Sequence, residues 1–110
     1  MNESKIRSVL EEIKKKENIP YTYHHFTEEE AVAPPFLVYL FPRSNHFIAD
    51  NRIYHKGYEI VLELYTDVKD IGLESVIEET LDAHGFVYRS EESWIDSEEM
   101  YVIYFFVDSV

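Results

Sequence analysis

The sequence predicts an α+β fold: a mainly antiparallel sheet of about five strands with two helices packed on one face, in the order α-β-β-β-α-β-β. Two segments, within residues 4–17 and after residue 70, repeat apolar side chains at helical spacing. Five others are rich in β-branched and aromatic residues and either alternate or are apolar throughout. A chain of 110 residues is large enough for one core, so we expect a single domain, 1–110.

The first helix is expected over about residues 4–17. Three lysines at 14–16 fall in its last turn, where positive charge complements the helix dipole. Pro20 ends it, because the residue before a proline disfavours the helical conformation. Residues 21–26 then alternate as a short strand. The apolar stripe of the helix comprises Ile6, Val9, Leu10 and Ile13.

Two strands of different character follow. Residues 36–41 are apolar at every position, which predicts a strand buried on both faces and closed by Pro42. A strand over about residues 54–65 alternates instead, so one face should meet the core and the other water. The expected core face carries Tyr58, Ile60, Leu62 and Leu64, and the expected wet face carries Glu59, Val61, Glu63 and Tyr65.

The second helix follows a capping segment at residues 66–70 and ends before Gly85, which is expected at the position after the C-cap. Two more strands are expected at 86–90, extended by Trp94 and Ile95, and at 100–107, with a tight turn at 96–99. The stripe of the second helix comprises Leu73, Val76, Ile77, Thr80 and Leu81.

Composition excludes several classes of function. There is no cysteine, which excludes disulfides, thiolate metal sites and thiol nucleophiles. The net charge of -12 repels nucleic-acid phosphates and anionic membranes, so neither is an expected partner. No run approaches the roughly 18 apolar residues of a membrane-spanning helix, and nothing marks the chain for export.

No catalytic signature is present, so we expect no enzyme, no cofactor and no metal. The three glycines are isolated, which argues against a phosphate-binding loop. His24 and His25 are adjacent on an expected strand and would point to opposite faces, so they are poorly placed to share a metal. An acid–base site built on Glu59, Glu63 and His55 ranks third among the possible functions.

The segment 42–53 is the candidate contact site. A loop of this length in a compact domain is uncommon unless it binds a partner, although Phe47 and Ile48 could instead tuck back onto the sheet. The last strand is apolar on both faces, so it is either central in the sheet or faces another subunit. The expected contact residues are Arg43, His46, Phe47, Ile48, Asp50, Asn51 and Arg52.

Over about residues 18–108 the sequence resembles small structural proteins encoded by long-tailed phages and prophages of Gram-positive bacteria. These proteins act in tail completion or head-to-tail joining, and their fold resembles that of the tail terminators, which cap the tail tube with a ring. The similar segments are residues 34–39, 44–51, 58–60, 63–70, 82–88 and 98–104.

The resemblance implies a homo-oligomeric ring with other virion tail or connector proteins as partners, located in the host cytoplasm during assembly and then in the virion. Identical subunits packed head to tail close into a ring when the rotation allows it. The alternative is a small cytosolic regulatory or ligand-binding domain with an aromatic groove between sheet and helices. That groove would be lined by Tyr39, Tyr65, Trp94 and Tyr104.

Overall fold

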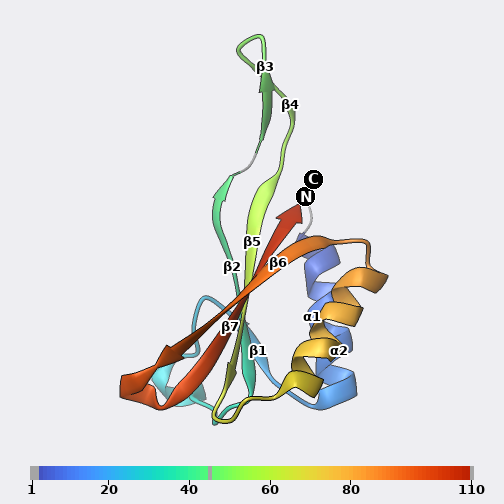
Figure 1. The fold of residues 1–110 in the computed structure, drawn as a ribbon. Helices are drawn as coiled ribbons and strands as arrows, with labels where there is room; N and C mark the ends of the chain where they lie inside the picture. Colours follow the sequence, from blue (N-terminus) through green and yellow to red (C-terminus); the bar gives the residue numbers. More distant parts are fainter. Residues whose placement is uncertain (1–2, 45, 110) are drawn as a thin grey trace.

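A computed structural model confirms the α+β class. It describes residues 3–44 and 46–109, excluding the side chains of residues 54, 55 and 109. Two α-helices lie side by side on one face of a five-stranded sheet, and a two-stranded sheet projects away from it (Figure 1). The elements are α1 (Glu3–Glu17), β1 (Tyr21–Tyr23), η1 (Glu28–Glu30), β2 (Phe36–Ser44), β3 (Phe47–Ala49), β4 (Arg52–His55), β5 (Tyr58–Thr66), α2 (Ile71–Ala83), β6 (Val87–Ile95), η2 (Asp96–Glu98) and β7 (Met100–Ser109).

The main sheet has the strand order β1-β2-β5-β7-β6. The pairs β2–β5, β5–β7 and β7–β6 are antiparallel, whereas β1 runs parallel to β2. The sheet is therefore mainly antiparallel, as predicted, but mixed. Strands β2, β5 and β7 occupy interior positions, so the central position that the sequence allowed for the last strand is the one observed.

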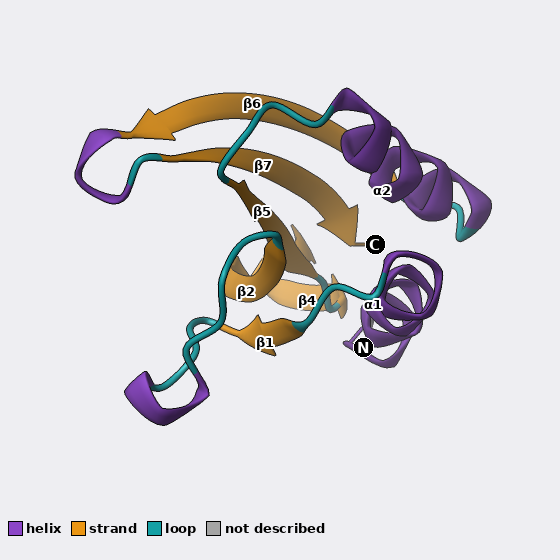
Figure 2. Cartoon of the chain, turned by 90° about the horizontal axis from the view of Figure 1, so that it is seen from below, coloured by secondary structure: helices purple, strands orange, loops and turns teal. Residues whose placement is uncertain are grey.

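The core lies between the helices and one face of the sheet. Every residue of the predicted α1 stripe is fully buried, and so are Ile60, Leu62 and Leu64 on the predicted core face of β5. Strand β7 adds Ile103, Phe105 and Val107 to the same cluster. Figure 2, seen from below, shows α1 and α2 together on this side of the curved sheet.

Helix α2 begins and ends where the sequence predicts, because both ends carry local capping signals. The Asp70 Oδ1 atom accepts a hydrogen bond from the Leu73 N–H at 3.0 Å. At the other end Gly85 takes a φ of 77°, and the N–H groups of Gly85 and Phe86 donate to the carbonyls of Asp82 and Leu81. These two bonds form a Schellman motif, which depends on the left-handed glycine.

Two predicted strand ends are wrong. The first strand stops at Tyr23 rather than at residue 26, because His24 takes a left-handed φ of 67°. Strand β2 does not close at Pro42 but continues to Ser44 through a register shift between Leu40 and Arg43. Since β1 has ended by then, that edge of β2 is unpaired, and an unpaired edge tolerates a proline that lacks an N–H.

The predicted strand over residues 54–65 is two strands, β4 and β5, separated by Lys56 and Gly57. Strand β4 leaves the main sheet and pairs with β3, which lies within the segment predicted as a loop. The segment between β2 and β5 is therefore a second hairpin rather than an irregular connection.

Alanine substitutions at Gly85, after the end of α2, and at Gly72, in its first turn, should differ in their effect on stability. Gly85→Ala is expected to lower the free energy of unfolding by about 1 kcal/mol, because alanine disfavours the left-handed backbone conformation of this position. The added Cβ would cause no clash, since it meets nothing within 4 Å. Gly72→Ala, whose Cβ would lie 3.6 Å from Asp70 Oδ1, should keep or raise that free energy because alanine favours the helix. Urea unfolding of both variants measures this, and equal losses would contradict it.

Candidate functional site

The candidate site combines a projecting hairpin and the sheet face that the helices leave uncovered. The hairpin, residues 46–57, is called the arm below; it carries β3 and β4 and extends well beyond the end of the main sheet (Figure 1). Asp50 and Asn51 form its turn, with φ values of 50° and 61°. Two consecutive left-handed residues are typical of the type I′ turn that suits the twist of a β-hairpin.

Two of the predicted contact residues hold the base of the arm. The Nδ1 atom of His46 accepts a hydrogen bond from the Gly57 N–H at 3.0 Å, and the imidazole ring lies edge-on to Tyr58. Arg43, just before the arm, places its Nε atom 2.8 Å from Glu59 Oε2 across the β2–β5 pair. Arg43 and His46 thus connect the two sides of the hairpin at the point where it leaves the main sheet.

The apolar side chains of the arm face solvent. Phe47 is 60% exposed and Ile48 is 65% exposed, so the alternative in which they tuck back onto the sheet is wrong. Ile53, which the predicted contact set omits, is 49% exposed and lies directly opposite Ile48 in the β3–β4 register. The exposed residues Asp50, Asn51 and Arg52 complete the tip.

The second part is the face of the main sheet opposite the helices, called the open face below. A row of Leu40, Val61 and Phe106 crosses β2, β5 and β7 in register. Arg89 continues this row onto β6. Acidic residues flank the row on both sides: Glu63 and Glu91 lie in the next row, on either side of Tyr104, and Glu59 lies on the other side of the row on β5. The open face therefore has an apolar centre between carboxylates.

These rows border a shallow hollow of about 320 Å³, called the open-face groove. Tyr104 and Phe106 stack side by side in it, with ring centroids 6.1 Å apart. The sequence signal for this groove is the second apolar face of β7, which the prediction left open between burial and contact. The lining residues are Leu40, Pro42, Arg43, Glu59, Val61, Glu63, Glu91, Tyr104 and Phe106.

The other end of the open face is covered by the chain itself. Phe26, in the connection after β1, packs edge-on against Phe36, and Phe36 stacks on Tyr65 with ring centroids 4.9 Å apart. The Tyr65 hydroxyl donates to Glu63 Oε1 at 2.7 Å. Burial, and next this bond to a carboxylate, raise the pKa of Tyr65 well above its ordinary value.

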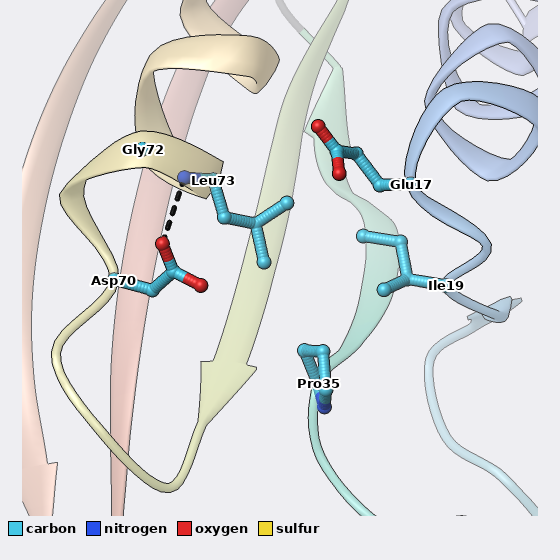
Figure 3. Close-up of a pocket in the computed structure, with 6 residues that line it drawn as sticks. All are labelled: Glu17, Ile19, Pro35, Asp70, Gly72 and Leu73. Carbon is cyan, nitrogen blue, oxygen red and sulfur yellow. Dashed lines mark hydrogen bonds between the residues drawn. The ribbon is translucent and has the colours of Figure 1, made fainter.

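A further hollow of about 470 Å³ lies between the end of α1 and the start of α2 (Figure 3). Ile19 and Leu73 point toward each other across it, and both belong to the buried core. Its carboxylates come from Glu17 and from Asp70, which already caps α2. This hollow is the seam where the two helices meet the sheet.

The aromatic groove of the alternative function is not formed. Tyr39 pairs with Leu62 on the helix side of the sheet and is buried in the core. Tyr65 and Tyr104 stand on the open face, since they are an odd number of positions from core residues of their strands. Trp94 pairs with Tyr101 near the far end of β6, so the four rings do not line one cavity.

The two glutamates of the acid–base alternative have contacts within the fold. Glu59 is paired with Arg43 and Glu63 with the Tyr65 hydroxyl, while the side chain of His55 lies outside the described residues. Among the side chains that the structure describes, which do not include that of His55, no group of three or more histidine, aspartate or glutamate residues is arranged to hold a metal ion. His24 and His25 contact each other through their Nδ1 atoms.

Comparison with known proteins identifies no relative: no protein-family model and no curated protein sequence matches the chain. Among the helices that the structure describes, none is long and apolar enough to cross a membrane.

The Tyr65 hydroxyl should make stability depend on pH at alkaline values. Tyrosine in the unfolded chain loses its proton near about pH 10, whereas folded Tyr65 keeps it, so the free energy of unfolding falls as the pH rises through that value. In Tyr65→Phe this fall should become shallower. It should not vanish, because burial raises the pKa of Tyr88 to about 12 and that residue acts in the same direction.

Urea midpoints of the wild type and the Tyr65→Phe variant, compared at about pH 8 and about pH 11, measure this effect. A variant whose stability falls as steeply as that of the wild type would contradict the assignment.

Proposed function

We propose that this protein is a non-enzymatic structural subunit of a phage or prophage virion, of the tail-terminator or head-tail joining type, which works by assembling into a ring. The observation that carries the proposal is the arm, a hairpin that projects from the domain (Figure 1). Its large apolar side chains Phe47, Ile48 and Ile53 are each about half exposed or more. Such a patch is typical of an element that becomes buried against a partner.

Energetics support a contact role for the arm. Fully burying one isoleucine side chain stabilises a contact by roughly 1.5–3 kcal/mol, and Ile48 and Ile53 stand together on the hairpin. The two-residue turn and the hydrogen bond from Gly57 to His46 hold the hairpin in one shape before binding. A preformed element loses less conformational entropy on association than a flexible loop does.

Charge supports the location in a virion. A net charge of -12 on each subunit would give a ring a strongly negative field. DNA passing through the ring would then be repelled from its wall instead of binding there. The groove carboxylates Glu59 and Glu63 have contacts within the fold, which fits a structural role better than catalysis.

Removing the apolar side chains of the arm should abolish assembly without unfolding the subunit. The Ile48→Ser/Ile53→Ser variant is expected to stay monomeric where the wild type forms oligomers, because the apolar area to be buried is lost. Since both side chains are exposed, each substitution should change the free energy of unfolding by no more than about 0.5 kcal/mol. Sedimentation velocity, with phage tail tubes absent and present, measures assembly.

A matched control is Val68→Ser/Ile71→Ser, which removes two side chains of similar exposure, 65% and 68%, at the opposite end of the molecule (Figure 1). This control should assemble and bind tubes like the wild type. Equal loss in both variants, or a wild type that is monomeric at high concentration and leaves tail tubes unbound, would overturn the proposal.

A further inference from the structure

We propose that the arm of one subunit docks in the open-face groove of a neighbouring copy of the same chain. This inference rests on the proposed function, because it names the surface that receives the arm. It concerns two surfaces that lie on different parts of the subunit.

The apolar parts of the two surfaces match. Leu40 and Phe106 are partly exposed in the centre of the groove, and Val61 lies between them in the same row. The arm presents Ile48 and Ile53 as a directly opposed pair on one face. Two directly opposed aliphatic side chains form an apolar surface about two strands wide, which is narrow enough to fit on the apolar surface formed by three adjacent strands.

The charges also match. The groove is lined by three carboxylates and one guanidinium, a formal net charge of −2. Arg89, which lines the adjoining hollow together with Glu59 and Glu91, makes the formal charge of the wider surface −1. The arm carries Arg52 and Lys56 against Asp50, so with its histidines neutral its formal charge is +1 in a chain of -12. Whole subunits repel one another because each is strongly negative. A contact between the positive arm and the negative groove places opposite charges together and so reduces this repulsion at the contact.

The groove already accepts a guanidinium. Arg43 lies on its wall with Nε 2.8 Å from Glu59 Oε2, whereas no residue in the described part of the chain forms an ion pair with Glu91. Glu91 is exposed on the opposite wall, on β6. Arg52 pairs with Ala49 and so lies on the hairpin face opposite to Ile48 and Ile53, but its long side chain can extend round the edge of the narrow hairpin. We assign Glu91 as the partner that Arg52 reaches in this way.

The arm reaches a neighbour rather than its own groove. It continues outward beyond the end of the main sheet, whereas the groove lies on the sheet itself (Figure 1). Because the arm and the groove are different surfaces, each subunit offers one of each. Two copies that exchanged arms reciprocally would form a closed dimer, whereas a one-way, head-to-tail contact leaves one arm and one groove free and closes into a ring when the rotation between subunits allows it. The proposed ring requires the one-way contact.

A charge exchange tests the predicted pair. Arg52→Glu should lose assembly, because a fourth carboxylate would enter an acidic groove. Adding Glu91→Arg in the same chain should restore assembly. Failure of the second substitution to restore it, measured by sedimentation velocity, would overturn the Arg52–Glu91 contact.

Crosslinking tests the docking site, and the absence of native cysteine allows single cysteines to be placed freely. I48C protein is mixed with E91C protein and oxidised. The control is I48C mixed with E92C, since Glu92 is the next residue on β6, is also exposed and points to the opposite face of the sheet. A crosslinked dimer is expected with E91C and is expected to be lost with E92C.

Oligomers that form without the E91C crosslink, or that crosslink equally with E92C, would overturn the docking site while leaving the proposed function intact. The absence of any oligomer, with tail tubes present, would overturn both. In a chain carrying I48C and E91C together, a ladder of crosslinked species longer than a dimer supports head-to-tail docking, whereas a crosslinked dimer alone would show reciprocal exchange and overturn the ring contact. A crosslinked monomer would show that the arm folds onto its own groove and would overturn the inference.

Discussion

The fold depends on the alternation along β5, the strand at the centre of the main sheet. Ile60, Leu62 and Leu64 are fully buried under the helices, while Glu59 and Glu63 share the other face. A slip of one residue would place both carboxylates in the core and the three aliphatic side chains outside, so the register of β5 is strongly specified. Strands β2 and β7 pair with β5 on either side, and their registers follow from it.

This alternation also determines what the rest of the chain leaves exposed. Both helices direct their apolar stripes to the Ile60 face, and the opposite face is covered at one end by the Phe26–Phe36–Tyr65 stack. At the other end β2 and β5 continue past the domain as the base of the arm. The open-face groove and the arm therefore arise from one feature: two long central strands covered on a single side.

The parts of the structure that the sequence predicts well are those with local causes. Helix α2 is bounded by a capping aspartate and a left-handed glycine, and the period of two along β5 predicts which of its faces meets the core, although not where the strand begins. The parallel pairing of β1 with β2 has no local signal, since it joins segments across a long connection. Pro42 was misleading because its effect depends on whether β1 still pairs beside it.

The candidate site was predictable only in part for the same reason. The sequence predicts a contact role for the segment around Phe47 but not its two short strands, because their Asp50-Asn51 turn is a weaker hairpin signal than Asn-Gly. The groove combines Leu40, Val61 and Phe106 from three strands, and no single stretch of sequence contains it. The predicted aromatic groove failed because Tyr39 and Tyr65 have opposite parity relative to the core residues of their strands.

Rigidity at the base of the arm links the local structure to the assembly that we propose. Acidic subunits repel one another over distances up to the screening length, about 10 Å at 0.1 M salt, so attraction must come from short-range contact at the arm. A head-to-tail contact closes into a ring only if each arm leaves its domain at a constant angle. The His46–Gly57 hydrogen bond and the Arg43–Glu59 ion pair lie where that angle is determined. We therefore infer that these polar contacts act on ring geometry, whereas Ile48 and Ile53 act on affinity.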